Sequence, residues 1–408
     1  MKNIGIIKES RRDEKRVPLI PSQVKNLINK YSDLKITVQP SSHRCFIDKE
    51  YEKMGAIIDN NLDKCDLILG VKEIEPSLLI PSKTYIFFSH TSKIKSDYSA
   101  AAQGTPGMDK KELLKEILQK NITLIDYENI RDNQSNRYLG FGRFAGIVGC
   151  YNSLNLYLER IGESAMPRAY IEDSFKKIKD NISKKNFDNA KILVTGDGRV
   201  AKGVLEFLSF ANIDAVEPGE FNSYNKSKSV YCNLPTSLYV KSKNNREFNL
   251  QNFIQYPDMY ASSLEDYLPY ATLLISAHYW DPKSPVLFNK KNVQNYKNLI
   301  AIGDITCDIN GSIPTTLRSS TIEKPYFYID RDSLEEVKND KNSLAIMAVD
   351  NLPSELPKNS SEEFGGGMVS EVIPFIIEKD DGRIMNATIC SNGKFCRSYE
   401  YLNDYINN

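Results

Sequence analysis

The sequence predicts an α/β protein made of two Rossmann-like domains, each built on a parallel sheet, with a cleft between them. Three observations favour this class: apolar runs of strand length alternate with amphipathic stretches of helical length, a glycine-rich turn joins one strand to one helix, and 408 residues suffice for two to three domains. The chain carries 53 Lys and Arg against 53 Asp and Glu. Because the net charge is zero, nucleic acid and anionic membranes are not expected as partners.

The first part of the chain alternates strands and helices. Strands are predicted at 4–7, 35–40, 66–71, 84–89 and 122–128, and helices at 21–31, near 48–54 and at 110–121. In the first helix, Val24, Leu27 and Ile28 share one face, and Pro21 stands in the first turn, where its missing N–H costs nothing. Strands and helices of these lengths predict βαβ units and a mainly parallel sheet.

A long helix with an apolar stripe, at about 144–161, is expected to lead into a second α/β block. That block contains predicted strands at 192–195, 273–276 and 299–305, and after residue 345 the sequence becomes helical again and closes with a short tail. We therefore predict a substrate domain formed by residues 1–143 and about 346–408, and a dinucleotide-binding domain formed by residues 144–345.

The glycine-rich turn in ILVTGDGRVAKG predicts a dinucleotide site. Gly196 follows the strand directly, Gly198 lets a pyrophosphate approach the next helix, and Ala201 allows that helix to pack closely. Glu217 ends the next predicted strand, where it is placed to accept hydrogen bonds from the adenosine ribose. A plain tight turn that binds nothing is the alternative. The turn residues predicted to contact the cofactor are Gly196, Gly198, Arg199 and Val200.

Cationic side chains and one histidine gather near predicted strand ends in the first block. Lys72 and His90 each lie just beyond a strand, where functional groups of open α/β sheets collect. Histidine titrates near neutrality, and lysine joins acid–base chemistry when burial or a neighbouring cation lowers its pKa. The alternative is that Lys72 and Arg137 are solvated surface charges and His90 is a turn residue. In the second block, Asp304 and Asp308 lie at the end of a predicted strand and either face the nicotinamide or shape a turn.

The remaining histidines and the cysteines predict neither a metal site nor a disulfide framework. His43 and His278 have no partner that the sequence suggests, so structural roles are expected, and three dispersed histidines do not form a zinc motif. Seven cysteines without a CxxC pair favour a reducing compartment, and we predict the cytoplasm.

Several long motifs resemble a known family. The opening IKESRRDEKRVPLIPSQVKNL resembles the alanine dehydrogenase, transhydrogenase and saccharopine dehydrogenase superfamily. The segments DLILGVKE, KTYIFFSHTSK, LIDYENIRD, VTGDGRVAKG, DITCDINGSI and AVDNLPSELPKNSSEEFG are similar, in this order, to the lysine–2-oxoglutarate reductase half of the lysine-catabolic enzyme. That half is the lysine-forming type of saccharopine dehydrogenase, and the similarity runs over nearly the whole chain.

The resemblance implies a reaction and a set of site residues. Such enzymes are oxidoreductases acting on CH–NH groups: they join the ε-amine of lysine to the keto carbon of 2-oxoglutarate and reduce the imine with a nicotinamide hydride, which gives saccharopine. It implies that Lys72 and His90 are the catalytic acid–base pair and that Asp308 lies near the nicotinamide. The substrate-binding residues that it implies are Arg16, Glu73, Lys93, Glu128, Arg137 and Phe141.

Some points stay open. Glu217 favours NAD, since an acid pairs with a free ribose 2′-OH, whereas the animal reductases carry a similar acid and favour NADP. The segment 96–108 reads as an insertion beside the His90 loop, and the saccharopine-cleaving activity fused to the animal reductases is not expected here. Alternative functions are an alanine dehydrogenase, an opine-type enzyme with another amine and keto acid, and a dinucleotide-sensing protein without catalysis.

Overall fold

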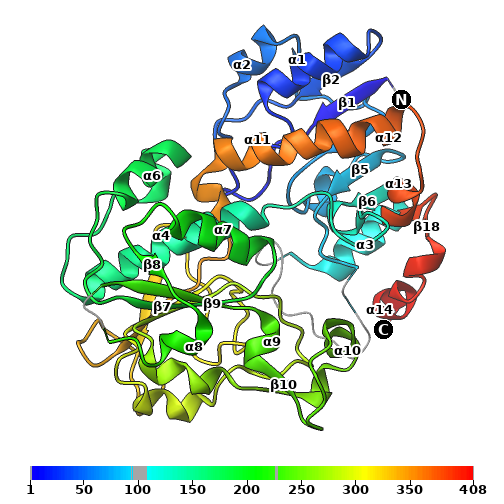
Figure 1. Ribbon diagram of the computed structural model, residues 1–408. Helices are drawn as coiled ribbons and strands as arrows, with labels where there is room; N and C mark the ends of the chain where they lie inside the picture. Colours follow the sequence, from blue (N-terminus) through cyan, green and yellow to red (C-terminus); the bar gives the residue numbers. More distant parts are fainter. Residues whose placement is uncertain (1, 93, 95–107, 226–227, 408) are drawn as a thin grey trace. The chain divides into compact units, whose positions relative to one another are not determined.

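The chain folds into two compact α/β units. The structure, a computed structural model, describes residues 2–92, 94, 108–225 and 228–407. One unit comprises Met1–Phe141 with Pro357–Asn408, and the other comprises Gly142–Leu356. Each unit contains one eight-stranded sheet, mostly parallel, so the predicted α/β class with two parallel-dominated sheets is confirmed (Figure 1).

The elements of the first unit follow the predicted alternation closely. Its strands are β1 (Asn3–Ile6), β2 (Lys35–Val38), β3 (Ile57–Ile58), β4 (Leu67–Leu69), β5 (Thr84–Phe87), β6 (Thr123–Asp126), β17 (Thr388–Ser391) and β18 (Lys394–Phe395). Its helices are α1 (Pro21–Lys30), α2 (Asp48–Lys53), α3 (Lys110–Gln119), α11 (Pro357–Gly367), α12 (Ile373–Ile377), α13 (Arg383–Ala387) and α14 (Leu402–Asn407).

The first sheet has the strand order β18-β17-β6-β5-β4-β1-β2-β3. Strands β1 to β6 pair in parallel, so their carboxyl ends meet at one edge, with Ile6 opposite Leu69 and Phe87 opposite Asp126. Strands β17 and β18 extend the sheet in antiparallel orientation. The sequence predicted only helices and a short tail in that region; the two strands are four and two residues long, too short for a clear alternating pattern.

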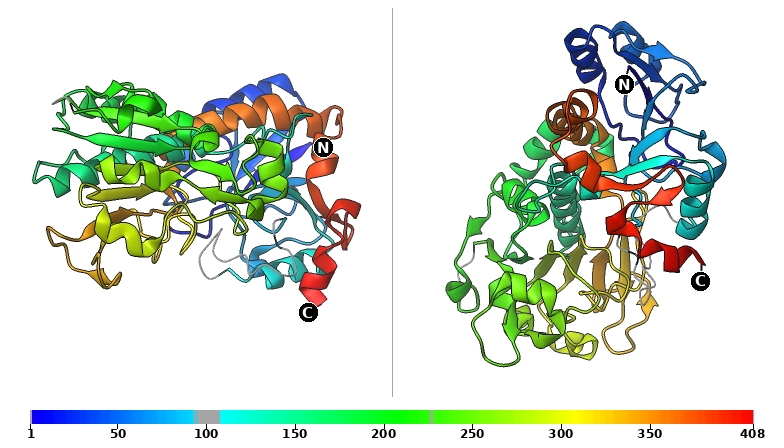
Figure 2. Two further views of the ribbon diagram at one scale, coloured as in Figure 1. Left: turned by 60° about the horizontal axis from the view of Figure 1, so that its bottom comes forward. Right: turned by 90° about the vertical axis from the view of Figure 1, so that its right-hand side faces the viewer.

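The C-terminal segment contributes core side chains to the first unit. The Val17 N–H donates to Ser361 Oγ at 2.9 Å, and Gln23 Nε2 donates to the Glu362 carbonyl at 2.8 Å. Phe364 of α11 is buried in the same core as Ile4. Figure 1 shows α11 and α12 beside β1 and β2, and Figure 2 shows the red C-terminal strands and helix next to the cyan α3 region.

The second unit is a separate α/β layer structure. Its strands are β7 (Lys191–Thr195), β8 (Asp214–Ala215), β9 (Val230–Leu234), β10 (Val240–Ser242), β11 (Tyr260–Ser262), β12 (Leu273–Ser276), β13 (Ala301–Asp304), β14 (Tyr326–Ile329), β15 (Glu336–Val337) and β16 (Leu344–Met347). Its helices are α4 (Gly142–Arg160), α5 (Ala169–Glu172), α6 (Phe175–Ile182), α7 (Arg199–Leu208), α8 (Pro218–Phe221), α9 (Thr236–Tyr239) and α10 (Leu250–Gln255).

The second sheet has the strand order β15-β14-β16-β13-β12-β7-β9-β8. Strand β16 pairs in parallel with β13, which is why this unit extends past the boundary at about 345 that the sequence predicted. Strand β9, not β8, lies beside β7. Helix α4 packs against α7 so closely that a Cβ on Gly146 would lie 2.0 Å from the Val200 carbonyl oxygen, and one on Gly203 would lie 2.2 Å from the Arg143 carbonyl oxygen.

Candidate active site

Lys72 and Glu73 lie just beyond the carboxyl end of β4. The Glu73 side chain is buried, whereas Lys72 is partly exposed. Burial lowers the pKa of Lys72, and the charge of Arg16 lowers it further, against the opposing charges of Glu14 and Glu73. The lowered pKa gives Lys72 more of its neutral form near pH 7, which is the form that acts as a base.

His90 follows β5, the strand next to β4, and its side chain points to Glu73. His90 Nδ1 lies 2.7 Å from Glu73 Oε1, and this partner outweighs burial and lowers the pKa of Glu73 to about 2. The backbone of His90 is left-handed, with φ of 51°. Non-glycine residues rarely adopt this conformation, and where they do, the strain often accompanies a functional role.

Arg16 and Glu14, in the loop between β1 and α1, form a buried ion pair. Arg16 is 3% exposed and Glu14 0%, and Arg16 Nε donates to Glu14 Oε1 at 2.7 Å. Burial raises the pKa of Glu14, but the charge and hydrogen bonds of Arg16 outweigh it, so the pKa is lowered. The Arg16 guanidinium stacks 4.0 Å from the centre of the Phe141 ring, and that ring stacks 4.5 Å from Phe364.

Glu128 and Arg137 form a second ion pair in the same unit. Arg137 Nη1 lies 3.1 Å from Glu128 Oε1, and the Arg137 side chain is 33% exposed. Of the predicted residues of the first unit, the structure therefore associates Arg16 with Phe141, Lys72 and Glu73 with His90, and Glu128 with Arg137. Lys93 and residues 96–107 of the predicted insertion lie outside the described residues.

Three buried carboxyl groups of this region were not predicted from the sequence: Glu9, Glu14 and Asp126. Glu9 accepts hydrogen bonds from the backbone N–H groups of Val71 and Lys72, and burial with the charge of Glu14 raises its pKa to about 8. Asp126 accepts a bond from the Ser89 N–H, and burial with the charge of Glu128 raises its pKa to about 6. Acidic residues are mostly exposed, so nothing in the local pattern indicates that these are buried.

In the second unit, the glycine turn has the geometry of an anion site. Gly196 has φ of 108°, and its Cβ would lie 2.7 Å from the Ala277 carbonyl oxygen, so glycine is required there by the protein itself. Gly198 precedes α7 without a capping side chain, and its Cβ would have no heavy atom within 4 Å. A helix start without a capping side chain and with open space beside Gly198 fits a pyrophosphate. Arg199 is exposed, and Val200 packs against the core.

Alanine substitutions at the two glycines are expected to separate folding from cofactor binding. Gly196→Ala should lower the free energy of unfolding by about 1–3 kcal/mol, because of backbone strain and the close carbonyl. Gly198→Ala should leave that free energy nearly unchanged and weaken NADH or NADPH binding by about tenfold, since the methyl group occupies the anion position. Urea unfolding and fluorescence titration measure the two effects. Equal loss of stability in both variants would contradict this assignment.

The structure places Glu217 farther from the turn than the usual Rossmann order does. Glu217 is exposed and lies two residues beyond β8, and β9 separates β8 from β7. The strand end next to the glycine turn is instead Leu234, which pairs in register with Thr195. To make the predicted ribose contact, the Glu217 side chain must therefore extend across the width of one strand, about 4.8 Å.

Asp304, the last residue of β13, and Asp308, in the loop after it, differ in their surroundings. Asp304 is buried; Oδ1 accepts from the Thr306 hydroxyl and Oδ2 from the Thr316 hydroxyl, each at 2.6 Å, while burial raises its pKa. These bonds fit the turn role for Asp304. Asp308 is partly exposed, and its carbonyl accepts from the Gly311 N–H at 2.9 Å.

His278 follows β12 and lies beside the glycine turn. Its Nδ1 is 2.8 Å from Thr195 Oγ1, and among the described residues its buried Nε2 has no hydrogen-bond partner. Burial lowers the pKa of His278 to about 4. The sequence predicted a structural role for this histidine, and the hydrogen bond to the end of β7 is consistent with it.

The lowered pKa predicts an acid-dependent loss of stability. The unfolded chain binds a proton at His278 near pH 6.5 and the folded chain only near pH 4, so stability is full above 6.5 and falls between these values. Over this pH range the free energy of unfolding falls by about 3 kcal/mol. His278→Gln should remove this part of the slope when urea unfolding is measured at pH 7 and pH 5. If parent and variant lose equal stability on acidification, His278 is not the source.

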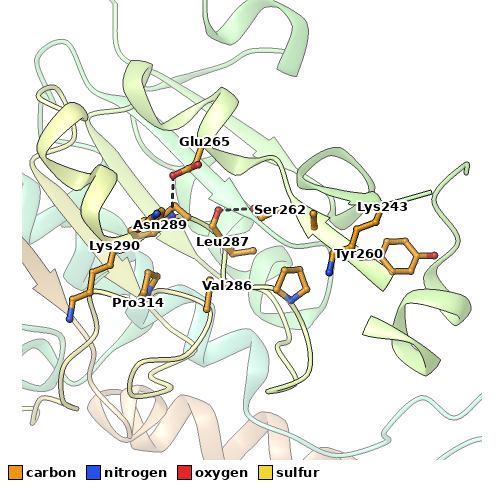
Figure 3. A pocket seen from close by; sticks show the side chains of 12 residues that line it. Lys243, Tyr260, Ser262, Glu265, Val286, Leu287, Asn289, Lys290 and Pro314 are labelled. Atoms are coloured by element: carbon orange, nitrogen blue, oxygen red, sulfur yellow. Dashed lines mark hydrogen bonds between the residues drawn. The ribbon is translucent and has the colours of Figure 1, made fainter. Parts of the chain in front are cut away.

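Figure 3 shows a hollow in the second unit, lined by residues of β11, by Lys243 and by residues 285–290. Its volume is about 560 Å³. Its polar groups hold residues 285–290 in place: Glu265 accepts from the Asn289 N–H at 3.0 Å, and Ser262 Oγ donates to the Leu287 carbonyl at 2.6 Å. None of its lining residues belongs to the glycine turn. We therefore assign it no part in catalysis.

The described residues offer neither a cluster of metal ligands nor a helix that could span a membrane. No group of three or more His, Cys, Asp or Glu side chains among them is arranged to hold a metal ion. Within the same residues, no helix combines the length and the apolar character needed to cross a membrane.

Comparison with known proteins agrees with the predicted resemblance. Residues 5–148 match the family described as "Alanine dehydrogenase/PNT, N-terminal domain". "Alpha-aminoadipic semialdehyde synthase, mitochondrial" from Bos taurus is 30% identical over 442 residues, covering 95% of this chain and 46% of that protein. "Saccharopine dehydrogenase [NAD(+), L-lysine-forming]" from Candida glabrata is 24% identical and covers 87% of each chain.

Solved structures support the fold. An L-alanine dehydrogenase superposes with a TM-score of 0.63 at 14% identity, covering 98% of this chain and 99% of that one. A transhydrogenase from Sinorhizobium meliloti gives 0.60 at 12% identity, covering 97% and 100%. The chain spans about half the length of the synthase relatives that it matches. The resemblance predicted from the motifs is confirmed: the chain is a homologue of the saccharopine dehydrogenases and the α-aminoadipic semialdehyde synthases, and its fold is that of the alanine dehydrogenases.

Proposed function

We propose that the chain is an NAD(P)-dependent oxidoreductase that reduces the imine of L-lysine and 2-oxoglutarate to saccharopine. One observation carries the proposal: Lys72, with its lowered pKa, lies next in sequence to Glu73, which holds His90, at adjacent strand ends of the first unit. Its relatives carry the matching names, saccharopine dehydrogenase and α-aminoadipic semialdehyde synthase. Imine formation needs proton transfer to a departing water, and two titratable groups at neighbouring positions supply it.

Lys72 and His90 divide the proton transfers in this proposal. Neutral Lys72 Nζ accepts a proton from the amine of the substrate as the amine attacks the keto carbon, and returns it to the keto oxygen, which gives the carbinolamine. Glu73 binds His90 at Nδ1, which fixes the ring orientation and directs proton exchange to Nε2. His90 Nε2 then donates the proton that lets the hydroxyl of the carbinolamine leave as water.

Arg137 binds a carboxylate of the substrates in this proposal, and Arg16 supports it. Arg137 is the more accessible, with its side chain 33% exposed, and a guanidinium binds a carboxylate through two parallel hydrogen bonds. Arg16 is buried against Glu14 and Phe141, so we assign it the edge of the site, where it adds positive charge. These roles position the reactants, which is how the protein lowers the barrier of a two-substrate condensation.

The cofactor site belongs to the second unit in this proposal. The N–H groups at the start of α7 and the open space at Gly198 bind the pyrophosphate. When bound, NADH or NADPH supplies the hydride that reduces the imine. We propose Asp308 and Arg199 as further cofactor contacts, and the choice between NAD and NADP rests on whether Glu217 reaches the ribose.

A substrate panel tests the reaction. NADH and NADPH oxidation is followed by absorbance with 2-oxoglutarate and, in turn, lysine, ornithine, ammonia and polyamines, and with pyruvate plus ammonia. We expect lysine with 2-oxoglutarate to give the highest kcat/KM. Consumption of pyruvate and ammonia with no response to lysine would replace the proposal by an alanine dehydrogenase, and binding of NADH without any turnover would replace it by a dinucleotide sensor.

We further propose the cytoplasm, a reducing compartment, as the location. None of the seven cysteines, all of which lie in the described part of the chain, forms a disulfide, and a reducing compartment keeps cysteines in this state. The synthase from Bos taurus carries the word mitochondrial in its name, so fractionation of the source cells decides between the two compartments.

A further inference from the structure

Two buried carboxyl groups, those of Glu9 and Asp126, accept hydrogen bonds from the turns that carry Lys72 and His90. Glu9 comes from the loop after β1, which is the neighbour of β4, and Asp126 ends β6, which is the neighbour of β5. Each therefore approaches, from the adjacent strand, the loop that follows an inner strand. Neither belongs to the acid–base pair or to the arginines proposed to bind substrate.

Glu9 holds the Lys72 turn through two backbone bonds. The Val71 N–H donates to Glu9 Oε1 at 2.6 Å, and the Lys72 N–H donates to Glu9 Oε2 at 3.0 Å. Glu9 is 8% exposed. Both N–H groups lie beyond the last residue of β4, where the Val71 carbonyl still accepts a hydrogen bond from the Phe88 N–H at 3.1 Å. The bonds to Glu9 give the two N–H groups the partner that buried backbone donors need.

Asp126 holds the His90 turn in the same way. The Ser89 N–H donates to Asp126 Oδ2 at 3.1 Å, and the Ser89 hydroxyl donates to the same oxygen. Ser89 Oγ also lies 2.7 Å from Thr91 Oγ1, so residues on both sides of His90 are fixed. This matters because the left-handed backbone of His90 is strained and persists only where its surroundings enforce it.

We propose that Glu9 and Asp126 are positioning residues, which set the places of Lys72 and His90 by bonding the backbone N–H groups of Val71 and Lys72 and the backbone and hydroxyl of Ser89. They touch the catalytic loops and not the reacting atoms. A displacement of about 1 Å at a catalytic group costs up to about a hundredfold in rate. Loss of either carboxyl group should therefore slow the reaction.

Hydrogen exchange of the backbone amides tests the hydrogen bonds of Glu9 and Asp126 without any assay of activity. In Glu9→Leu, the amides of residues 71–72 should exchange about tenfold faster while those of 89–91 keep the parent rate, and in Asp126→Leu the pattern should be reversed. Glu9→Gln and Asp126→Asn keep one carbonyl acceptor and should show intermediate rates, and they serve if a leucine variant does not fold. Glu50→Leu, which removes the acceptor of the Ile47 N–H at the start of α2, is the matched control and should change neither segment.

The kinetic arm rests on the proposed function. With lysine, 2-oxoglutarate and NADH or NADPH, the leucine variants should lower kcat by about ten- to a hundredfold with KM little changed, and the amide variants should recover part of it. Unchanged exchange in both target segments overturns the inference, even if kcat falls. If the parent reduces no imine of lysine, the proposed function fails while the exchange pattern still decides the inference.

Discussion

Lys72→Met and His90→Gln should each lower kcat for lysine with 2-oxoglutarate by about 10²–10⁴-fold, the range that one positioned acid or base contributes. Methionine keeps the length of the Lys72 side chain without a titratable amine. Glutamine keeps a hydrogen-bond partner for Glu73 without an imidazole ring that transfers a proton. Steady-state kinetics from pH 5 to pH 10 check this, and the limb of the parent profile that belongs to Lys72 should be absent from Lys72→Met.

Two controls separate chemistry from binding and folding. Lys83→Met removes a lysine just before β5, at the opposite end of the strand that leads to His90, and should leave kcat at the parent value. NADH binding, measured by fluorescence, should be unchanged in all three variants, because the proposed cofactor residues belong to the second unit. Parent-like kcat in both Lys72→Met and His90→Gln would exclude this acid–base pair.

The strands that carry these residues could be predicted because their signal is local. Apolar runs such as DLILGV and TYIFFS are long enough to identify β4 and β5, and the rule that functional groups follow parallel strands then selects Lys72 and His90. The glycine turn could be found for the same reason, since strand, turn and helix are contiguous. Gly196 shows the required positive φ.

The pairing partners could not be predicted, because periodicity identifies strands and not their neighbours. Strand β9 lies between β7 and β8, which moves Glu217 away from the glycine turn. The role of Asp304 could not be predicted either. Its position at the end of a strand predicts a functional carboxylate or a turn, and only the Thr306 and Thr316 hydroxyls around it favour the turn.

The buried acids were missed for a related reason. Glu9 and Glu14 stand among charged or polar neighbours, where a sequence indicates a solvated surface, and Asp126 ends an apolar strand, where an acidic residue is expected to reach solvent. Their burial follows from long-range packing, including the Phe364 ring that α11 brings from far along the chain to Phe141 and Phe88. The Phe141 ring in turn covers the Arg16 guanidinium.

Glu14→Gln is expected to lower the free energy of unfolding by about 3–5 kcal/mol, the largest effect on stability that we expect from a single charge in the first unit. The change removes the carboxylate that faces a guanidinium only 3% exposed, and water does not replace it there. Because Arg16 lowers the pKa of Glu14 below 4.5, the stability from this pair is present above that value and is lost as the pH falls further. Urea unfolding at pH 7 measures the loss.

Two further variants test whether burial governs the Glu14–Arg16 pair: one breaks an exposed ion pair, and the other removes both buried charges. Asp33→Asn breaks the Lys2–Asp33 pair, whose side chains are 71% and 75% exposed, and should cost at most about 1 kcal/mol. Glu14→Leu combined with Arg16→Met removes both buried charges and should cost less than Glu14→Gln alone, because no buried charge is left without its partner. An equal cost for Glu14→Gln and Asp33→Asn would show that water reaches Arg16 and that burial does not govern this pair.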